Sequence, residues 1–319
     1  MNADELKACL QAYYDEYDKI GVSVYAILKD QNTSEPVRLD IEGDALDGLK
    51  ELFIQSLREA ISDKDELALL DLSSSDERLD AIYVYDLEVP EELAALETVT
   101  AQDNLPLLNL NGQSLSSIKA LLIEIGNNIG QIVLYKTMAP VNIFGRKNFF
   151  LKKAKHRLEK IDDEFLRVSA GFQMLRINGS LLVLDLEALE RSFGFHDVIK
   201  KEAALGVAAI EAVSLIDNPD VLLELLDDLK YARRLTKIAK SSPVLKAGVS
   251  NENIIRFCQN FPKLSGKIRF NEAQNKIILD TKVSKDLFIK LLMDDFLTSE
   301  LTNFHYASVA KDSLDDQAP

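Results

Sequence analysis

Apolar residues recur first at helical and then at strand spacing along the first part of the chain. Intervals of three and four residues predict helices over residues 3–20 and 45–61. Short apolar runs bounded by turn-forming residues predict strands over 21–29, 36–42 and 78–89. A mixture of the two kinds of element indicates an α/β arrangement for this part of the chain.

The middle of the chain carries the clearest local signal. Two apolar runs between residues 172 and 187 flank Asn178-Gly179, and both of these residues tolerate the positive φ that a two-residue type I′ turn requires. The pattern therefore predicts a β-hairpin. Before it, we expect a helix over 114–126 and a strand over 131–138.

The remainder is mostly helical in pattern. Residues 197–240 favour helix almost throughout, with a helix start at Asn218-Pro219. Further helices are expected near 251–260 and 284–297, with a strand pair near 267–282.

These elements together predict the fold class α+β. We expect a mixed α/β N-terminal domain over residues 1–133 and a hairpin- and helix-rich domain over residues 134–312. Residues 313–319 are expected to form a flexible tail.

Length and composition are those of an ordinary globular protein of about two domains. The longest apolar stretch falls short of the ~18 residues of a membrane helix, and the first residues lack the pattern of a signal peptide. Cys9 and Cys258 offer neither a disulfide framework nor metal-ligand spacing. We therefore expect a cytoplasmic protein that does not itself insert into a membrane.

Charge is distributed unevenly along a chain whose formal net charge is −15. Residues 1–135 hold 9 basic and 27 acidic residues, whereas residues 136–160 hold 8 basic residues and 1 acidic residue. A second basic stretch, without any acid, follows at 229–250, where basic residues recur at three- and four-residue intervals and so share one helix face. Such asymmetry indicates a charged partner rather than a particular fold.

Concentrated cations in an acidic protein can bind the phosphates of a nucleic acid, since salt screens charges more than ~10 Å away. A solvated surface, or pairing with the excess acids, explains the same patches equally well. The candidate DNA-binding residues are Lys136, Arg146, Lys147, Lys152, Lys153, Lys155, Arg157, Lys230, Arg233, Arg234, Lys237 and Lys240.

Enzyme signals are poor, and the sequence predicts no catalytic residue, cofactor or metal. One faint pattern is Asp280-Thr281-Lys282 at the end of an apolar run, because an acid-x-Lys at a strand end occurs in metal-dependent nucleases. Asp185 would then supply a second acid. Ordinary polar residues at strand ends account for the same pattern.

Three stretches of the C-terminal part resemble a known family. Residues 135–153, 177–195 and 291–311 are similar to KwaB, the soluble subunit of the bacterial Kiwa anti-phage defence system, and the resemblance covers roughly residues 100–312. It implies a dimer that binds phage DNA, impedes its replication and expression, and works with the membrane protein KwaA. It would thus reside in the cytoplasm, at the inner membrane through that partner.

The acidic residues 1–135 acquire a hypothetical role from this resemblance. Cytoplasmic loops of membrane proteins are rich in Lys and Arg, so an acidic domain would be attracted to them. A gain in solubility explains the acidity equally well. Two further hypotheses remain: a metal-dependent nuclease, and an acidic mimic of DNA that inhibits a nucleic-acid enzyme.

Overall fold

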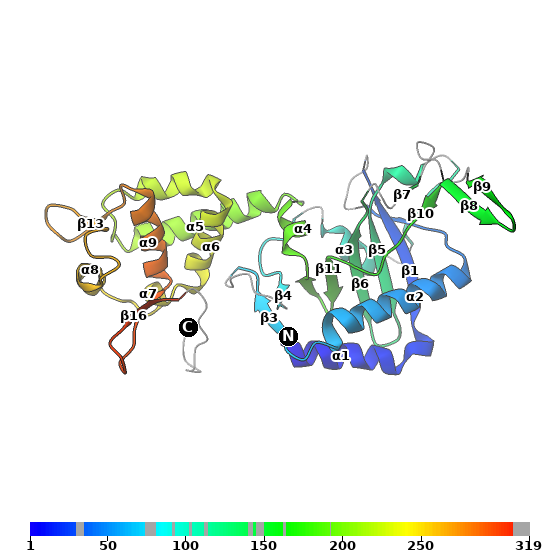
Figure 1. Ribbon diagram of the computed structural model, residues 1–319, viewed down its shortest axis with the longest axis horizontal. Coiled ribbons are helices and arrows are strands. Elements are labelled where there is room, and N and C mark those ends of the chain that lie inside the picture. The colour runs from blue at the N-terminus through cyan, green and yellow to red at the C-terminus, as the bar shows by residue number, and fades with distance from the viewer. Residues whose placement is uncertain are drawn as a thin grey trace. The chain divides into compact units, whose positions relative to one another are not determined.

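The chain divides into two compact units in the computed structural model (Figure 1). Unit 1 comprises residues 1–70 and 79–194, and unit 2 comprises residues 71–78 and 195–319. The structure describes residues 1–29, 35–73, 81–90, 93–101, 104–111, 114–139, 143–144, 150–161, 164–191 and 193–308. The expected tail over 313–319 lies outside these residues.

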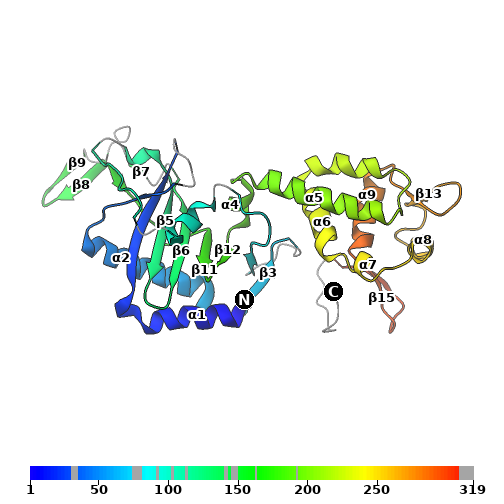
Figure 2. The same ribbon diagram turned by 180° about the vertical axis from the view of Figure 1, so that it is seen from behind.

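Unit 1 is built on one eight-stranded sheet with the strand order β2-β1-β5-β6-β11-β12-β4-β3. The strands are β1 (Gly21–Leu28), β2 (Val37–Arg38), β3 (Ala68–Asp71), β4 (Ala81–Val84), β5 (Ile118–Gly126), β6 (Gln131–Thr137), β11 (Met174–Ile177) and β12 (Ser180–Val183). β1, β5, β6, β11 and β12 pair with their neighbours in antiparallel fashion. Figure 2 shows the same sheet from behind.

Helices cover this sheet on both faces. Leu10 of α1 (Ala3–Asp15) and Phe53 of α2 (Gly43–Leu57) are buried in one apolar cluster with Ile123 of β5. α3 (Ala95–Ala101) contacts β6 from the other face (Figure 1). Burial on both faces explains the long apolar run of β5, because neither face of a central strand is exposed to solvent and polar residues are therefore not favoured at alternate positions.

The helix predicted over residues 114–126 is therefore wrong. Residues Leu115–Ser117 form one short 3-10 turn (η4), and the rest is strand β5. Leu121 and Leu122 point to opposite faces of the sheet, yet both are almost fully buried. Periodicity alone cannot separate such a strand from a buried helix, although the β-branched Ile118, Ile123 and Ile125 favour strand.

The predicted hairpin at Asn178-Gly179 is confirmed. β11 and β12 pair with Ile177 opposite Ser180, which leaves Asn178 and Gly179 as a two-residue turn. Both residues have positive φ, at 49° and 79°. The local sequence thus determines this turn, as the type I′ pattern requires.

The boundary between the units differs from the one expected at residues 133 and 134. That position lies inside β6, whose pairing with both β5 and β11 binds the chain on either side of it into one sheet. The structure instead divides after Gly194, at the start of α5. The α+β class is confirmed, with the eight-stranded sheet in unit 1 and helices in both units.

Unit 2 is organised around α5 (Phe195–Ala212) and α6 (Leu229–Ser241), which make close contact. A Cβ atom at Gly206 would lie 2.1 Å from the carbonyl oxygen of Leu235, so only glycine permits this approach. Buried Leu235 and Ile238 fix the inner face of α6. The outer face of α6 is the predicted basic face.

The other predicted features of unit 2 are present with shifted ends. η6 (Pro219–Asp227) begins at Pro219 as predicted, but the Asn218 side chain bonds to the backbone of Leu279 instead of capping the helix. The remaining elements of this unit are α7 (Pro243–Lys246), α8 (Asn251–Asn260), β13 (Arg269–Phe270), β14 (Ile277–Ile278), α9 (Lys282–Leu292), β15 (Phe296–Thr298) and β16 (His305–Ala307).

Candidate nucleic-acid interface

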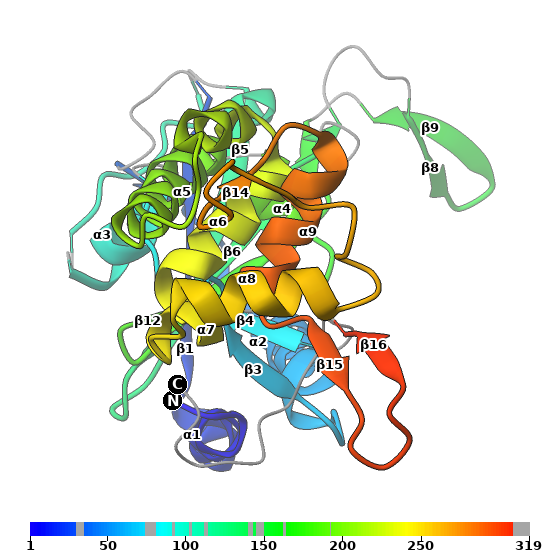
Figure 3. The ribbon, with the colours of Figure 1, turned by 90° about the vertical axis from the view of Figure 1, so that its left-hand side faces the viewer.

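Part of the first basic patch, residues 150–161, forms a separate two-stranded hairpin of unit 1. β8 (Phe150–Ala154) pairs with β9 (Arg157–Ile161), and this pair belongs to no larger sheet. Lys153 lies opposite Leu158, and Ala154 opposite Arg157, so Lys155 and His156 form the turn. The hairpin projects beyond the main sheet of unit 1 (Figure 3).

The cations described in this hairpin face solvent. Lys153, Lys155 and Arg157 are exposed, and Arg157 keeps 79% of its side-chain exposure. Arg157 pairs with Glu159 at 2.8 Å, an exposed ion pair of small energetic value. These three side chains can therefore reach a phosphate without first breaking a buried interaction.

Other members of the predicted patch are only partly placed. Arg146 and Lys147 lie outside the described residues, and so does the side chain of Lys152. The backbone of Lys152 lies in β8 opposite Glu159. The candidate surface described by the structure thus rests on Lys153, Lys155 and Arg157.

Lys136 does not belong to this surface. Only 4% of the residue is exposed, and its ammonium donates hydrogen bonds to Ser169 Oγ at 2.9 Å and to the carbonyl oxygen of Gly171. Burial lowers the pKa of Lys136, because it penalises the charged form. Its predicted phosphate contact is corrected to a structural role, in which it holds the segment before β11.

The second basic patch, on α6, is more deeply embedded. Lys230 is exposed, whereas Arg233, Lys237 and Lys240 are each partly buried. Asp228 caps the helix by accepting a hydrogen bond from the backbone N–H of Lys230. The cations do share the outward side of the helix, as the spacing predicts, but packing limits how far they extend into solvent.

Arg234 takes part in an ion-pair network between α6 and α9. Its guanidinium lies 2.9 Å from Asp286 Oδ1, and Lys290 lies 2.8 Å from Asp286 Oδ2. Burial alone would raise the pKa of Asp286, but the hydrogen bonds and charges of Lys290 and Arg234 outweigh it and lower the pKa. Arg234 therefore joins two helices, and a phosphate would have to compete with Asp286 for it.

Comparison with known proteins identifies the family. The model of the family described as "Kiwa protein KwaB-like" matches residues 115–302, which is more than half of the chain. The chain belongs to this family. It is also 30% identical over 325 residues to the "Kiwa protein KwaB" of Escherichia coli O55:H7 (strain RM12579 / EPEC), with 99% of this chain and 100% of that protein covered. No solved structure matches the chain.

The KwaB-like region crosses the boundary between the units. It begins just before β5 and ends in the β15–β16 hairpin, so it includes β8–β9 and α6. Both basic patches thus lie within the segment that defines the family. The resemblance that the sequence suggested is confirmed.

The acid-x-Lys pattern has structural explanations in this KwaB-like chain. Asp280 Oδ2 accepts a hydrogen bond from Arg269 at 2.8 Å, and Thr281 caps α9. Asp185 accepts a hydrogen bond from the backbone N–H of Ala188 and lies in the other unit. Among the described residues, no cluster of three His, Cys, Asp or Glu side chains could hold a metal ion.

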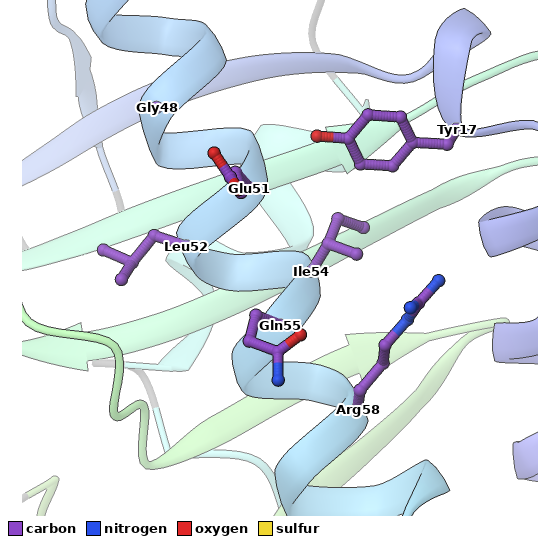
Figure 4. Close-up of a pocket in the computed structure, with 7 residues that line it drawn as sticks. All are labelled: Tyr17, Gly48, Glu51, Leu52, Ile54, Gln55 and Arg58. Carbon is purple, nitrogen blue, oxygen red and sulfur yellow. The ribbon is translucent and has the colours of Figure 1, made fainter.

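Sequence reasoning missed a pocket of about 610 Å³ on the outer side of α2 (Figure 4). Glu51, Leu52 and Gln55 line it from α2, beside Tyr17 and Arg58. The spacing of the α2 residues marks one helix face, which is the signal that could have found it. Glu51 and Arg58 contribute one negative and one positive charge to its lining, so the pocket does not favour a polyanion.

None of the helices placed in the structure combines the length and the apolar character needed to cross a bilayer.

Proposed function

We propose that this protein is a non-enzymatic effector of anti-phage defence that binds DNA through its phosphates, without sequence preference. Bound protein then obstructs the replication or expression of phage DNA. The observation that carries the proposal is the exposed cationic hairpin β8–β9, within a chain of the KwaB-like family.

The proposed binding is driven by the exchange of counterions. Each Lys or Arg that neutralises a phosphate releases condensed cations from the DNA, so affinity falls steeply as salt rises. Phosphate contacts carry no sequence information, which suits a protein that must recognise any incoming DNA. Obstruction requires occupancy alone, so neither a metal nor a catalytic residue is part of the proposal.

The net negative charge of the chain is compatible with this binding. Three cations within the short segment from Lys153 to Arg157 form a local positive field. Charges more than about 8–10 Å away are largely screened at physiological salt, so distant acids weaken the attraction only slightly.

The proposal includes a membrane partner and a second copy of the chain. We expect a homodimer in the cytoplasm that is held at the inner membrane by a KwaA-like protein with positively charged cytoplasmic loops. Acidic side chains of unit 1 would supply the complementary charge, because Asp47, Glu51, Asp65 and Glu66 are exposed. Lys substitution of these four acids should reduce co-purification with the partner. Undiminished co-purification would exclude this docking surface.

The experiment that tests DNA binding is a salt titration of the full chain with unrelated duplexes of equal length. We expect similar affinities for all sequences, with log affinity falling linearly against log salt. Fluorescence anisotropy of labelled DNA measures both properties. An absence of binding at low salt, in protein with a native circular-dichroism spectrum, would refute the proposal.

A further inference from the structure

The β8–β9 hairpin has the form of an isolated ribbon. Five cross-strand pairs join its strands, from Phe150 opposite Ile161 to Ala154 opposite Arg157. The structure assigns the pair to a two-stranded sheet of its own. A two-stranded ribbon gains little stability by itself, so a projecting one is suited to insertion into a partner.

Both faces of this ribbon present exposed side chains. Lys153 and Leu158 form a cross-strand pair on one face, and both are exposed. Arg157 neighbours Leu158 in β9 and therefore points to the opposite face, where it is exposed as well. A ribbon that only covered its own protein would bury one of these faces.

Size selects between the two grooves of DNA. Side chains project from both faces of the ribbon and give it a thickness of about 10 Å, close to the ~12 Å width of the major groove. The minor groove is only about 6 Å wide, so it excludes a two-stranded ribbon unless the duplex deforms.

Charge and apolar surface are placed as the major groove requires. The segment Phe150–Ile161 contains five basic residues and one acid. Lys153 and Arg157 lie on opposite faces of the ribbon, so an inserted ribbon would present a cation to the phosphates on each side of the groove. Leu158 is 63% exposed, and the thymine methyl group, which only the major groove displays, offers it an apolar contact.

From this geometry we infer that the β8–β9 hairpin inserts into the major groove of duplex DNA, with its cations on the phosphates of both strands. This inference rests on the DNA binding proposed above and adds the groove, the requirement for duplex and the inserted element. Binding stays largely independent of sequence, because most of the affinity comes from phosphates.

The test compares two duplexes of identical sequence and charge. In one of them every cytosine carries a glucosylated hydroxymethyl group at C5, which fills the major groove without altering the phosphates. We expect the full chain to bind the unmodified duplex at least about tenfold more tightly. Netropsin, which occupies the minor groove of A·T tracts, should change the affinity by less than about twofold.

A variant of the hairpin tests whether this element causes the preference for the unmodified duplex. The combined substitutions Lys153→Gln, Arg157→Gln and Leu158→Ser should bring the affinity ratio of the two duplexes close to one. The matched control, Lys246→Gln with Lys263→Gln, removes two exposed charges of unit 2 and should keep the ratio of the wild type.

The two proposals fail differently. Equal affinity of the wild type for both duplexes, or displacement by netropsin, would overturn the major-groove inference while DNA binding stands. A preference that persists in the hairpin variant would also overturn it. Failure to bind either duplex at low salt would overturn DNA binding and the inference together.

Discussion

The hairpin β8–β9 and the helix α6 are both rich in basic residues, but they lie in different structural environments. In the hairpin, Lys153, Lys155 and Arg157 extend into solvent from a ribbon outside the main sheet. In α6, Arg234 pairs with Asp286 of α9, and the helix packs tightly on α5. The same density of cations is thus exposed to solvent in one place, as the proposed binding surface, and forms part of an ion-pair network in the other.

This difference shows that a basic run is informative only together with its surroundings. Cations on an isolated ribbon carry no packing task, so substitutions there should change binding and leave stability intact. Cations on a helix that lies between two others contribute to folding first. The following experiments test the packing and the ion pairs on which this comparison depends, and they are arranged from the largest expected effect to the smallest.

Gly206→Ala should have the largest effect on stability. The added Cβ would lie 2.1 Å from the carbonyl oxygen of Leu235, so α5 and α6 must separate. We expect unfolding of unit 2 to become easier by about 3 kcal/mol, as overpacking in a core predicts. Chemical denaturation measures this loss.

Gly48→Ala in α2 is the matched control. A Cβ there meets no atom within 4 Å, so the higher helix propensity of alanine should stabilise unit 1 by roughly 0.5–1 kcal/mol. Equal effects of the two substitutions would show that α6 is not tightly packed on α5.

Lys136→Met should destabilise unit 1 by about 2 kcal/mol, because Ser169 and the Gly171 carbonyl lose a charged donor. Burial lowers the pKa of Lys136 in the folded state, so the unfolded chain holds this proton more tightly. Wild-type stability should therefore rise with pH toward the ordinary lysine pKa of 10.5, and the variant should lack that rise.

Denaturation at a series of alkaline pH values measures both effects. DNA affinity of folded protein should stay unchanged at neutral pH. A large loss of affinity in Lys136→Met, with native stability, would restore Lys136 to the phosphate surface.

Arg234→Ala should cost about 1 kcal/mol of unit 2 stability at neutral pH, since the pair with Asp286 is only partly buried and Lys290 remains. The pKa of Asp286 is lowered in the folded state, so the ion-pair network stabilises the fold at pH values above the ordinary pKa of 3.8. This stabilisation is lost as the pH falls through the folded-state pKa. The difference between variant and wild type should thus shrink in acid.

Thermal denaturation at neutral and acidic pH checks this expectation. An effect that stays constant with pH would mean that Arg234 stabilises through the packing of its alkyl chain rather than through Asp286.

Asp280→Ala should have the smallest effect. It removes one partly exposed ion pair with Arg269, for which we expect a loss below about 1 kcal/mol. Linear and circular DNA should remain intact with Mg²⁺ or Mn²⁺ in both the wild type and the variant. Cleavage by the wild type that disappears in the variant would establish the nuclease hypothesis instead.

The sequence predicts local features of this fold better than long-range ones. Asn178-Gly179 determines its own turn, because the requirement for positive φ is local. The helix predicted over 114–126 fails because β5 is buried on both faces by segments distant in the sequence, with α1 and α2 on one of these faces. The boundary at residue 133 fails for a related reason, since the sequence does not show that β6 pairs on both sides.

The candidate site shows the same limit. Spacing correctly places the α6 cations on one helix face, and composition finds the cationic segment of the hairpin. Neither reveals that Lys136 is buried or that Arg234 pairs with Asp286. The residues that bind these two side chains are distant in the sequence, and only the tertiary fold brings them together. The family resemblance was recognisable from short stretches, since those do not depend on packing.

The central claim is that the hairpin rather than the rest of the charged surface binds DNA. The most direct test compares the DNA affinity of two triple variants that change the net charge equally. One combines Lys153→Glu, Lys155→Glu and Arg157→Glu in the hairpin. The other combines Lys246→Glu, Lys263→Glu and Lys267→Glu in unit 2. We predict a loss on the order of a hundredfold at low salt for the hairpin variant, and about threefold or less for the other. Equal losses in the two variants would contradict the account.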